Sequence, residues 1–279
     1  MNEQLFDKRG IMIKASIFDL ILFEKKKAFY SNKHFLKGLI AAILRGVGYR
    51  KNFEYPWVLN NLQIKEKDKI LDIGCGNSPL SLFLASKGVE ITAVDIREDV
   101  IEKYINIAQS IGLKKAMMKG TLTIKALDAR KLPYPDEYFD KIYAISSLEH
   151  FREKGDIECI KEMSRVLKPA GYIGITVPFS KRFFEKESTY YVPYYEKRYD
   201  FAMLNERIII PSALDVVKID YANEKIFKFH RFFYTKGKWF RYSLGNFIPF
   251  FSKIFYGNIK LNEDADIACI ILRKRDSNI

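Results

Sequence analysis

The sequence predicts an α/β protein built on a doubly wound, mostly parallel sheet of seven strands, with a helical extension before the sheet and an insertion near its end. From residue 69 onward, short apolar runs typical of buried strands alternate with amphipathic helical segments, and glycine or proline separates them. Strands that alternate with helices form parallel sheets, because each right-handed crossover returns the chain to the same edge. The ligand of such a sheet lies beyond the carboxyl ends of its strands.

The central part of the chain contains five predicted strands. They are expected at residues 69–73, 89–94, 122–126, 138–146 and 172–177, with helices at residues 79–87, 98–111 and 153–167. The last helix is expected to end in a turn at residues 168–171, because Pro169 cannot continue it and Gly171 permits the turn. Two more strands, at residues 213–221 and 267–273, have no helical pattern between them and are expected to form an antiparallel pair.

Length, composition and cysteine spacing limit the class of protein. The chain has 279 residues, of which 48% are hydrophobic and 29% charged, and these values exclude a disordered or collagen-like chain. Cys75, Cys159 and Cys269 lie far apart, so neither a disulfide framework nor a structural zinc site is expected, and the cytoplasm is the expected location. No apolar run reaches 18 residues, so we expect no membrane-spanning segment.

Charge is distributed unevenly along the chain, whose formal net charge is +13. Residues 1–51 and residues 223–260 are both strongly basic, whereas the middle is nearly balanced. The pattern predicts a central domain with additions at both ends. We expect a helical extension at 1–62, a core at 63–222 with an acceptor arm at 179–212, a basic aromatic insertion at 223–263 and a final core strand at 264–279.

A glycine turn follows the first predicted strand, in the stretch ILDIGCGNS at residues 70–78. Gly74 and Gly76 let the backbone approach a ligand closely. A dinucleotide site would need a third glycine at residue 79, which is Pro79. Asp72 precedes the first glycine by two residues, and a carboxylate there would repel a diphosphate but could help hold a cationic ligand such as a sulfonium amino acid.

Acidic residues also follow the next two predicted strands. Asp95 ends the second strand, 21 residues after Gly74, where a carboxylate can accept hydrogen bonds from the hydroxyls of a ribose. Asp128 follows the third strand, where a short acidic side chain can accept a hydrogen bond from the exocyclic amine of adenine. Each acidic residue alone is a weak signal, since Asp commonly caps helices. One behind each of three successive strands predicts a nucleoside site.

Residues 69–178 resemble a class I S-adenosylmethionine-dependent methyltransferase of the small-molecule branch. ILDIGCGNS, VDI and ALDARKLPYPDEYFDKIYAISSLEHF are similar to the first four motifs of that family, and LKPAGYIGITVP resembles the turn into its fifth strand. The resemblance implies a Rossmann-like methyltransferase fold and S-adenosyl-L-methionine as the cofactor. It implies as cofactor-binding residues Asp72, Gly74, Gly76, Asp95, Ile96, Asp128, Ala129 and Ser146. Many members have a third glycine where this chain has Ser78; the hydroxyl could cap the next helix, and loss of cofactor binding is the alternative.

The stretch SSLEHF after the fourth strand faces the cofactor's methyl group in this family, which makes Glu149 and His150 the candidate catalytic residues. The near-neutral pKa of an imidazole suits proton abstraction from a hydroxyl group. In the alternative interpretation the pair only shapes the turn into the next helix. Some quinone-pathway methyltransferases have a metal-binding acidic residue three positions before the Glu; this chain has Ser146 there, so no metal is predicted.

The acceptor site is expected to come from segments outside the core. Residues 188–199 contain five tyrosines, and these, with Arg182 or Arg198, could bind a sugar or a phosphorylated acceptor; simple packing of the tyrosines is the alternative. The stretch YPWVL at residues 55–59, together with YEKRYD, resembles methyltransferases of bacterial surface-glycan clusters.

Residues 223–260 interleave thirteen aromatic residues with Lys and Arg. Such a segment can pack on residues 29–48 as a lid or homodimer surface, meet an anionic membrane surface, or bind nucleic acid. We predict a cytoplasmic methyltransferase that acts on a small-molecule or glycan-type acceptor, at oxygen, with peripheral association at the inner membrane face as a further option. The alternatives are an RNA methyltransferase and a non-catalytic subunit that binds S-adenosylmethionine.

Overall fold

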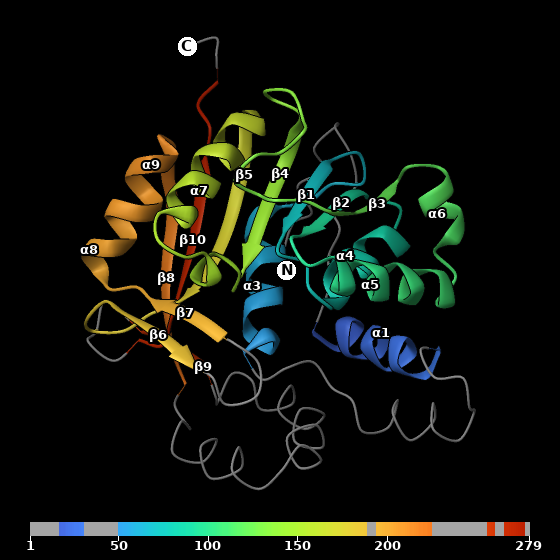
Figure 1. The fold of residues 1–279 in the computed structure, drawn as a ribbon, viewed down its shortest axis with the longest axis horizontal. Helices are drawn as coiled ribbons and strands as arrows, with labels where there is room; N and C mark the ends of the chain where they lie inside the picture. The colour runs from blue at the N-terminus through green and yellow to red at the C-terminus, as the bar shows by residue number, and fades with distance from the viewer. Residues whose placement is uncertain (1–16, 31–49, 189–193, 225–255, 260–264, 277–279) are drawn as a thin grey trace, which may run out of the picture.

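The computed structural model describes residues 17–30, 50–188, 194–224, 256–259 and 265–276. In this part of the chain, eight strands form one sheet with the order β3-β2-β1-β4-β5-β10-β8-β9 (Figure 1). The strands are β1 (Lys69–Ile73), β2 (Glu90–Asp95), β3 (Leu122–Ala126), β4 (Phe139–Ile145), β5 (Leu167–Pro178), β8 (Asp215–Glu224), β9 (Tyr256–Ile259) and β10 (Ile267–Arg273). Strands β1 to β5 pair in parallel, whereas β10 pairs antiparallel with both β5 and β8.

Seven of these strands are the predicted ones, and the antiparallel pairing of the last two, β8 and β10, is confirmed. The eighth strand, β9, was not predicted and belongs to the insertion expected at residues 223–263. It pairs antiparallel with β8, with Tyr221 opposite Ile259 and Glu224 opposite Tyr256. The insertion therefore extends the sheet at its edge.

The start of β5 corrects one predicted turn. Residues 168–171, expected to form a turn after the preceding helix, lie within β5, and the ladder with β4 shifts its register between Phe139 and Lys141. Gly171 is needed here, because a Cβ atom on it would lie 2.7 Å from the carbonyl oxygen of Lys168. The irregularity accommodates Pro169, which has no amide hydrogen to donate to a regular ladder.

Helices cover both faces of the sheet (Figure 1). One face is covered by α3 (Lys51–Leu62), α4 (Pro79–Ser86) and α5 (Glu98–Ser110), with α1 (Ile17–Tyr30) packed against these helices. The short α6 (Lys114–Met118) precedes β3, and α7 (Gly155–Val166) packs on the opposite face. Because both faces are covered, the central strands are buried on both sides and are apolar almost throughout.

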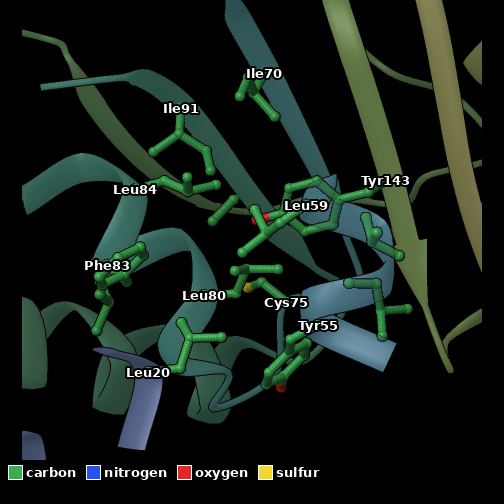
Figure 2. Close-up of a cluster of buried hydrophobic side chains, with 14 of the residues drawn as sticks. Leu20, Tyr55, Leu59, Ile70, Cys75, Leu80, Phe83, Leu84, Ile91 and Tyr143 are labelled. Atoms are coloured by element: carbon green, nitrogen blue, oxygen red, sulfur yellow. The ribbon is translucent and has the colours of Figure 1, made fainter. Parts of the chain in front are cut away.

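Each face of the sheet has its own hydrophobic cluster. Ile70 and Leu71 are neighbours on β1, yet they belong to different clusters, because successive side chains of a strand point to opposite faces. Figure 2 shows part of the first cluster, in which Leu80 of α4 lies between the sheet and Leu20 of α1. Tyr55 of α3 points into the same cluster, so two helices from the start of the chain complete this core.

The predicted acceptor arm at residues 179–212 has regular structure. It begins with the antiparallel hairpin β6 (Phe184–Ser188) and β7 (Tyr194–Arg198). Three short helical segments follow: α8 (Phe201–Leu204), the π-helix η2 (Asn205–Ile209) and α9 (Ile210–Ser212). The hairpin lies at the end of the sheet toward which β4 and β5 point (Figure 1).

The predicted domain boundaries stay a prediction. The extension expected at residues 1–62 includes α1 and α3, and the rest of it lies outside the described residues. Most of the insertion at 223–263 also lies outside them, so the expectations of a lid, a homodimer surface, a membrane surface or nucleic-acid binding are predictions only. In the described ranges, no helix combines the length and the apolar character that crossing a membrane requires.

Candidate functional site

The glycine turn after β1 is held close to the end of β4. Gly74 and Gly76 have φ angles of +71° and +51°, a left-handed backbone conformation that residues other than glycine rarely adopt. A Cβ atom on Gly74 would lie only 2.5 Å from the Cβ atom of Ser147, so no larger residue fits there. The amides of Gly74 and Cys75 both donate to the carbonyl oxygen of Val94, which ties the turn to β2.

Ser78 follows the turn and caps α4, as predicted. Its Oγ accepts a hydrogen bond of 3.1 Å from the amide of Leu80, and Pro79 occupies the first turn of the helix, where a missing amide hydrogen does no harm. Ser78 therefore serves the helix terminus with its side chain and leaves the turn intact.

A cavity of about 980 Å³ lies at the carboxyl ends of β1, β2 and β4. Ligand sites of proteins commonly measure about 300 to 1,000 Å³, so this volume is enough for a nucleoside cofactor with a second molecule beside it. The predicted residues that line the cavity are Asp72, Gly74, Gly76, Asp95, Ile96, Asp128, Ala129, Ser146 and His150. Glu149, Arg182 and Arg198 are not among its lining residues.

Asp72 is the deepest acidic residue of the cavity. Ser81 Oγ donates a hydrogen bond of 2.5 Å to Asp72 Oδ2 and lies 2.8 Å from the hydroxyl oxygen of Tyr143. Burial raises the pKa of Asp72 to about 7, and the bond from Ser81 only partly opposes this effect. A positively charged ligand would stabilise the ionised carboxylate, so the position suits a cation and not a phosphate.

Asp95 is bound by the glycine turn and by Arg97. Its Oδ2 accepts from the amide of Gly76 at 3.0 Å, and the guanidinium of Arg97 donates to both carboxylate oxygens at 3.0 and 3.1 Å. Burial alone would raise the pKa of Asp95, but the hydrogen bonds and charge of Arg97 outweigh burial and hold it below the ordinary value. Asp95 is therefore ionised at neutral pH. Ile96 beside it is 64% exposed and presents an apolar surface to the cavity.

Asp128 repeats this arrangement one strand away. Arg130 donates to it through Nε at 3.0 Å and through the terminal nitrogen at 2.6 Å, and these bonds lower the pKa of Asp128. Both acidic residues therefore stand in an Asp-x-Arg pattern in which the arginine holds the carboxylate. The sequence stretches DIR and DAR contain this signal, but the arginines were not predicted to belong to the site.

Ser146 is bound to the N-terminal part of the chain. Its Oγ donates to Glu54 Oε1 of α3 at 2.5 Å, and Thr176 Oγ1 donates to the same oxygen at 2.9 Å. The carboxylate also pairs with Lys51 at 2.9 Å, and Lys51 donates to the carbonyl oxygen of Ile145 at 3.1 Å. The hydroxyl hydrogen of Ser146, a predicted cofactor residue, is therefore donated to Glu54 and not directed at a ligand.

Residues of the N-terminal helices were missed as site residues. Glu24 of α1 and Lys51 and Tyr55 of α3 line the cavity. No local motif marks them, because they come before the recognisable glycine turn and reach the site only through packing.

His150 and Glu149 occupy different positions relative to the cavity. His150 lines it, and its Nδ1 lies 2.8 Å from the carbonyl oxygen of Tyr195 on β7. Glu149 lies behind and is buried; its Oε2 has no hydrogen-bond partner among the described residues, and burial raises its pKa to about 8. Its Oε1 is 3.9 Å from His150 Nε2. Within the described ranges, no group of three or more His, Cys, Asp or Glu residues could hold a metal ion.

The eight-stranded sheet with helices on both faces and a cavity at the carboxyl strand ends defines a Rossmann-like methyltransferase fold. A crystal structure of an S-adenosylmethionine-dependent methyltransferase from Methanosarcina mazei aligns with a TM-score of 0.55 and 20% identity, covering 79% of this chain and 98% of that one. This likeness supports the fold.

Sequence comparison relates the central part of the chain to known methyltransferases. Residues 70–171 match the family model of a methyltransferase domain. The 27-O-demethylrifamycin SV methyltransferase of Amycolatopsis mediterranei is 32% identical over 115 residues, which are 41% of this chain and 40% of that protein. A ubiquinone/menaquinone biosynthesis C-methyltransferase of Neisseria meningitidis is 31% identical over 138 residues, 48% of this chain and 52% of that protein.

Residues 70–171 therefore match a methyltransferase domain, and the fold is that of S-adenosylmethionine-dependent methyltransferases, whose cofactor is S-adenosyl-L-methionine. The matched regions span about half the length or less of these curated relatives. The cavity fits the cofactor in two respects: Gly74 and Gly76 line it without side chains, so that the backbone can approach a ligand closely, and buried Asp72 suits a cationic group.

Proposed function

We propose that the protein is a methyltransferase that moves the methyl group of S-adenosylmethionine to an oxygen atom of a small-molecule acceptor of glycan type. The observation that carries this proposal is the shared cavity, where the glycine turn, three acidic residues and His150 meet. S-adenosylmethionine supplies an activated methyl group on a sulfonium. The protein then has to bind both molecules, align them and accept a proton.

The cofactor would lie along the ends of three neighbouring strands. Asp72 and the turn at Gly74 and Gly76 would face its cationic amino-acid end, where the buried carboxylate gains a positive partner. Asp95 would accept hydrogen bonds from the ribose hydroxyls while Arg97 keeps the carboxylate ionised.

The adenine would lie at the end of β3. Asp128 would accept from its exocyclic amine beside Ala129, and the exposed side chain of Ile96 would pack on the ring. Ser146 would contribute its backbone to the cofactor site, since its hydroxyl donates to Glu54.

His150 would accept the acceptor's proton. A hydroxyl group is a weak nucleophile and has to lose its proton, so a positioned base favours transfer to oxygen. The Nδ1 atom faces the carbonyl oxygen of Tyr195, which can only accept, so the neutral ring carries its hydrogen on Nδ1 and a lone pair on Nε2. The Amycolatopsis relative is named for an O-demethyl substrate, which favours oxygen, whereas the Neisseria relative is a C-methyltransferase.

The glycan type of acceptor is supported by the mixed polar and aromatic surface that Tyr195, Phe151, Arg152 and Glu153 present at one side of the cavity. Saccharides expose both hydroxyl groups and apolar ring faces, and such a surface meets both. The predicted membrane and nucleic-acid contacts depend on residues 223–263, most of which lie outside the described residues, and they add nothing to this proposal.

Calorimetric titration with S-adenosylhomocysteine tests the cofactor site, with NAD as the competing ligand. We expect micromolar binding of the first and none of the second. Asp95→Ala should weaken binding at least about tenfold, because a hydrogen bond to a charged group contributes about 1.5 to 3 kcal/mol. Asp99→Ala is the matched control, since Asp99 is exposed on α5, where it pairs with Lys103. Equal affinity of the Asp95 variant and the wild type would refute the ribose assignment.

Acceptor screening tests the rest of the proposal. Saccharides and other hydroxyl-bearing small molecules are incubated with radiolabelled S-adenosylmethionine, and label in an ether-linked methyl group supports transfer to oxygen. Label on carbon would overturn the oxygen assignment, and label lost on nuclease treatment would favour RNA as the acceptor. Binding of S-adenosylhomocysteine without turnover of any acceptor would favour a non-catalytic subunit.

A further inference from the structure

One buried carboxylate, that of Asp156, binds the acceptor arm at several points. Its Oδ1 accepts hydrogen bonds from Lys197 Nζ at 3.0 Å and from Arg207 at 2.7 Å. Its Oδ2 accepts from the hydroxyl of Tyr199 and from Arg207 Nε, both at 2.8 Å. The side chains of Asp156 and Lys197 are both fully buried. Three residues of the arm therefore share a single acidic partner near the start of α7.

The same three arm residues also bind the backbone just before α7. Lys197 Nζ donates to the carbonyl oxygen of Glu153 at 2.8 Å, and Arg207 donates to the same carbonyl group. The Tyr199 hydroxyl lies 3.4 Å from the carbonyl oxygen of Leu148. The arm therefore contacts both ends of the segment 148–156, which contains His150: Leu148 at one end and Asp156 at the other.

β7 brings this attachment to the cavity. Tyr195 precedes Lys197 by two residues on β7, and alternate residues of a strand lie on the same side of it. Its carbonyl oxygen is the one that lies 2.8 Å from His150 Nδ1, and its side chain lines the cavity. The position of this carbonyl group therefore depends on how β7 is held against the start of α7.

A competing partner stands on the other side of the ring. Glu149 Oε1 lies 3.9 Å from His150 Nε2, and the ionised form of Glu149 would draw the ring hydrogen to Nε2. A ring with its hydrogen on Nε2 could not accept a proton from the acceptor at that atom. The Tyr195 carbonyl group opposes this by holding the hydrogen on Nδ1.

We propose that Asp156 is a positioning residue for methyl transfer: it holds β7 so that the Tyr195 carbonyl group keeps the hydrogen of His150 on Nδ1 and leaves Nε2 to accept the proton. The proposal rests on the proposed role of His150 as the base. Asp156 itself does not line the cavity, so it acts only through the arm.

Nitrogen NMR of the histidine rings tests the tautomer directly. The chain has only three histidines, so loss of one signal set in His150→Gln assigns the ring of interest. In the wild type at neutral pH we expect the neutral ring of His150 to carry its hydrogen on Nδ1. In Asp156→Asn we expect a mixture of the two tautomers. A hydrogen on Nε2 in the wild type, or an unchanged Nδ1 tautomer in the variant, would overturn the proposal.

Two further variants keep the test decisive. Asp156→Asn leaves the buried Lys197 and the partly exposed Arg207 with a weaker partner and can fail to fold, which circular dichroism would show. In that case Lys197→Met is measured in place of Asp156→Asn, because the Met variant removes one buried cation while Arg207 and Tyr199 still bind Asp156. We expect the same shift toward mixed tautomers of His150. Asp136→Asn is the control, because Asp136 pairs with Arg165 away from the cavity and its loss should not change the tautomer.

Activity and binding separate this proposal from the proposed function. Once an acceptor is found, Asp156→Asn should lower kcat at least about tenfold, since a positioned base contributes on the order of 10² or more to the rate. The affinity for S-adenosylhomocysteine should stay within about twofold of the wild type. If the wild type bound no S-adenosylhomocysteine, the proposed function would fail, whereas the tautomer measurement would still decide the role of Asp156 on the ring.

Discussion

Ser146 at the end of β4 donates its hydroxyl hydrogen to Glu54 of α3 across 92 positions of the sequence, at 2.5 Å. Glu54 is buried and also binds Lys51 and Thr176, so one carboxylate joins the N-terminal helix to the ends of β4 and β5. Lys51 lines the cavity and Glu54 lies behind it. The contact makes the docking of α3 part of the cofactor site.

Removing the Glu54 carboxylate should affect both stability and binding. Glu54→Ala leaves the partly exposed Lys51 ammonium and two hydroxyl groups without their acceptor, and each buried polar group left without its hydrogen bond costs about 1 to 3 kcal/mol. Urea unfolding measures the loss. We also expect weaker binding of S-adenosylhomocysteine, because the wall formed by Lys51 and Tyr55 loses its attachment. Glu66→Ala is a control in the following loop, and a loss of the same size there would argue against a specific role of Glu54.

The stability of the protein should fall as the pH rises from about 4.5 to about 8, owing to Glu149. Burial raises the pKa of this group from 4.5 to about 8, so in that window the folded state binds a proton that the unfolded state has released. The stability that the protonated carboxyl group contributes is fully present below the pKa of Glu149 in the unfolded chain. It is lost as the pH rises through the pKa of Glu149 in the folded protein.

Glu149→Gln removes that group from the titration. Thermal or urea unfolding at pH 5, 6.5 and 8 should show a smaller decline in the variant than in the wild type. Part of the decline should remain, because the pKa of Asp72 is also raised, to about 7. Parallel pH profiles of variant and wild type would show that Glu149 is not buried as a neutral acid.

Gly74→Ala should disrupt the cofactor turn. The new methyl group would stand 2.5 Å from Ser147 Cβ, and the backbone at φ +71° is strained for alanine. We expect a loss of about 2 to 4 kcal/mol in the free energy of unfolding and a strong loss of S-adenosylhomocysteine binding.

Gly88→Ala separates steric overlap from backbone strain. Gly88 has φ +87°, but no atom lies within 4 Å of a Cβ atom built there. Its replacement should cost only about 1 to 2 kcal/mol and leave binding unchanged. Equal effects of the two alanines on binding would mean that the close approach of Gly74 to Ser147 does not shape the site.

Local sequence signals predicted most of the central sheet. The apolar runs of β1 to β4 and the glycine turn between β1 and α4 stand out because each depends on neighbouring residues alone. The predicted cap at Ser78 and the antiparallel pairing of β8 with β10 are confirmed. Asp72, Asp95 and Asp128 share one cavity, as expected when parallel strands end at the same edge. Their roles toward a cofactor stay predictions.

Other features had no local signal. Strand β9 at the sheet edge, the early start of β5 and the hairpin β6–β7 depend on their partner strands, and their own residues are polar or mixed. Arg97 and Arg130 stand beside predicted acidic residues in the sequence, yet arginine at that spacing is equally common on exposed surfaces.

The sequence by itself determined the order of strands and helices in the core, the backbone freedom of the cofactor turn and the acidic residue behind each of three strands. These properties are encoded locally: the spacing of apolar residues defines strands and helices, glycine frees the backbone of the turn, and position in the chain places each acidic residue at a strand end. Only the tertiary structure decided that Lys51 and Tyr55 line the cavity, that Glu54 binds Thr176 across 122 positions, and that Asp156 fastens the arm beside His150. Such contacts join residues far apart in the chain, and burial of the whole core, which no short segment specifies, brings them together.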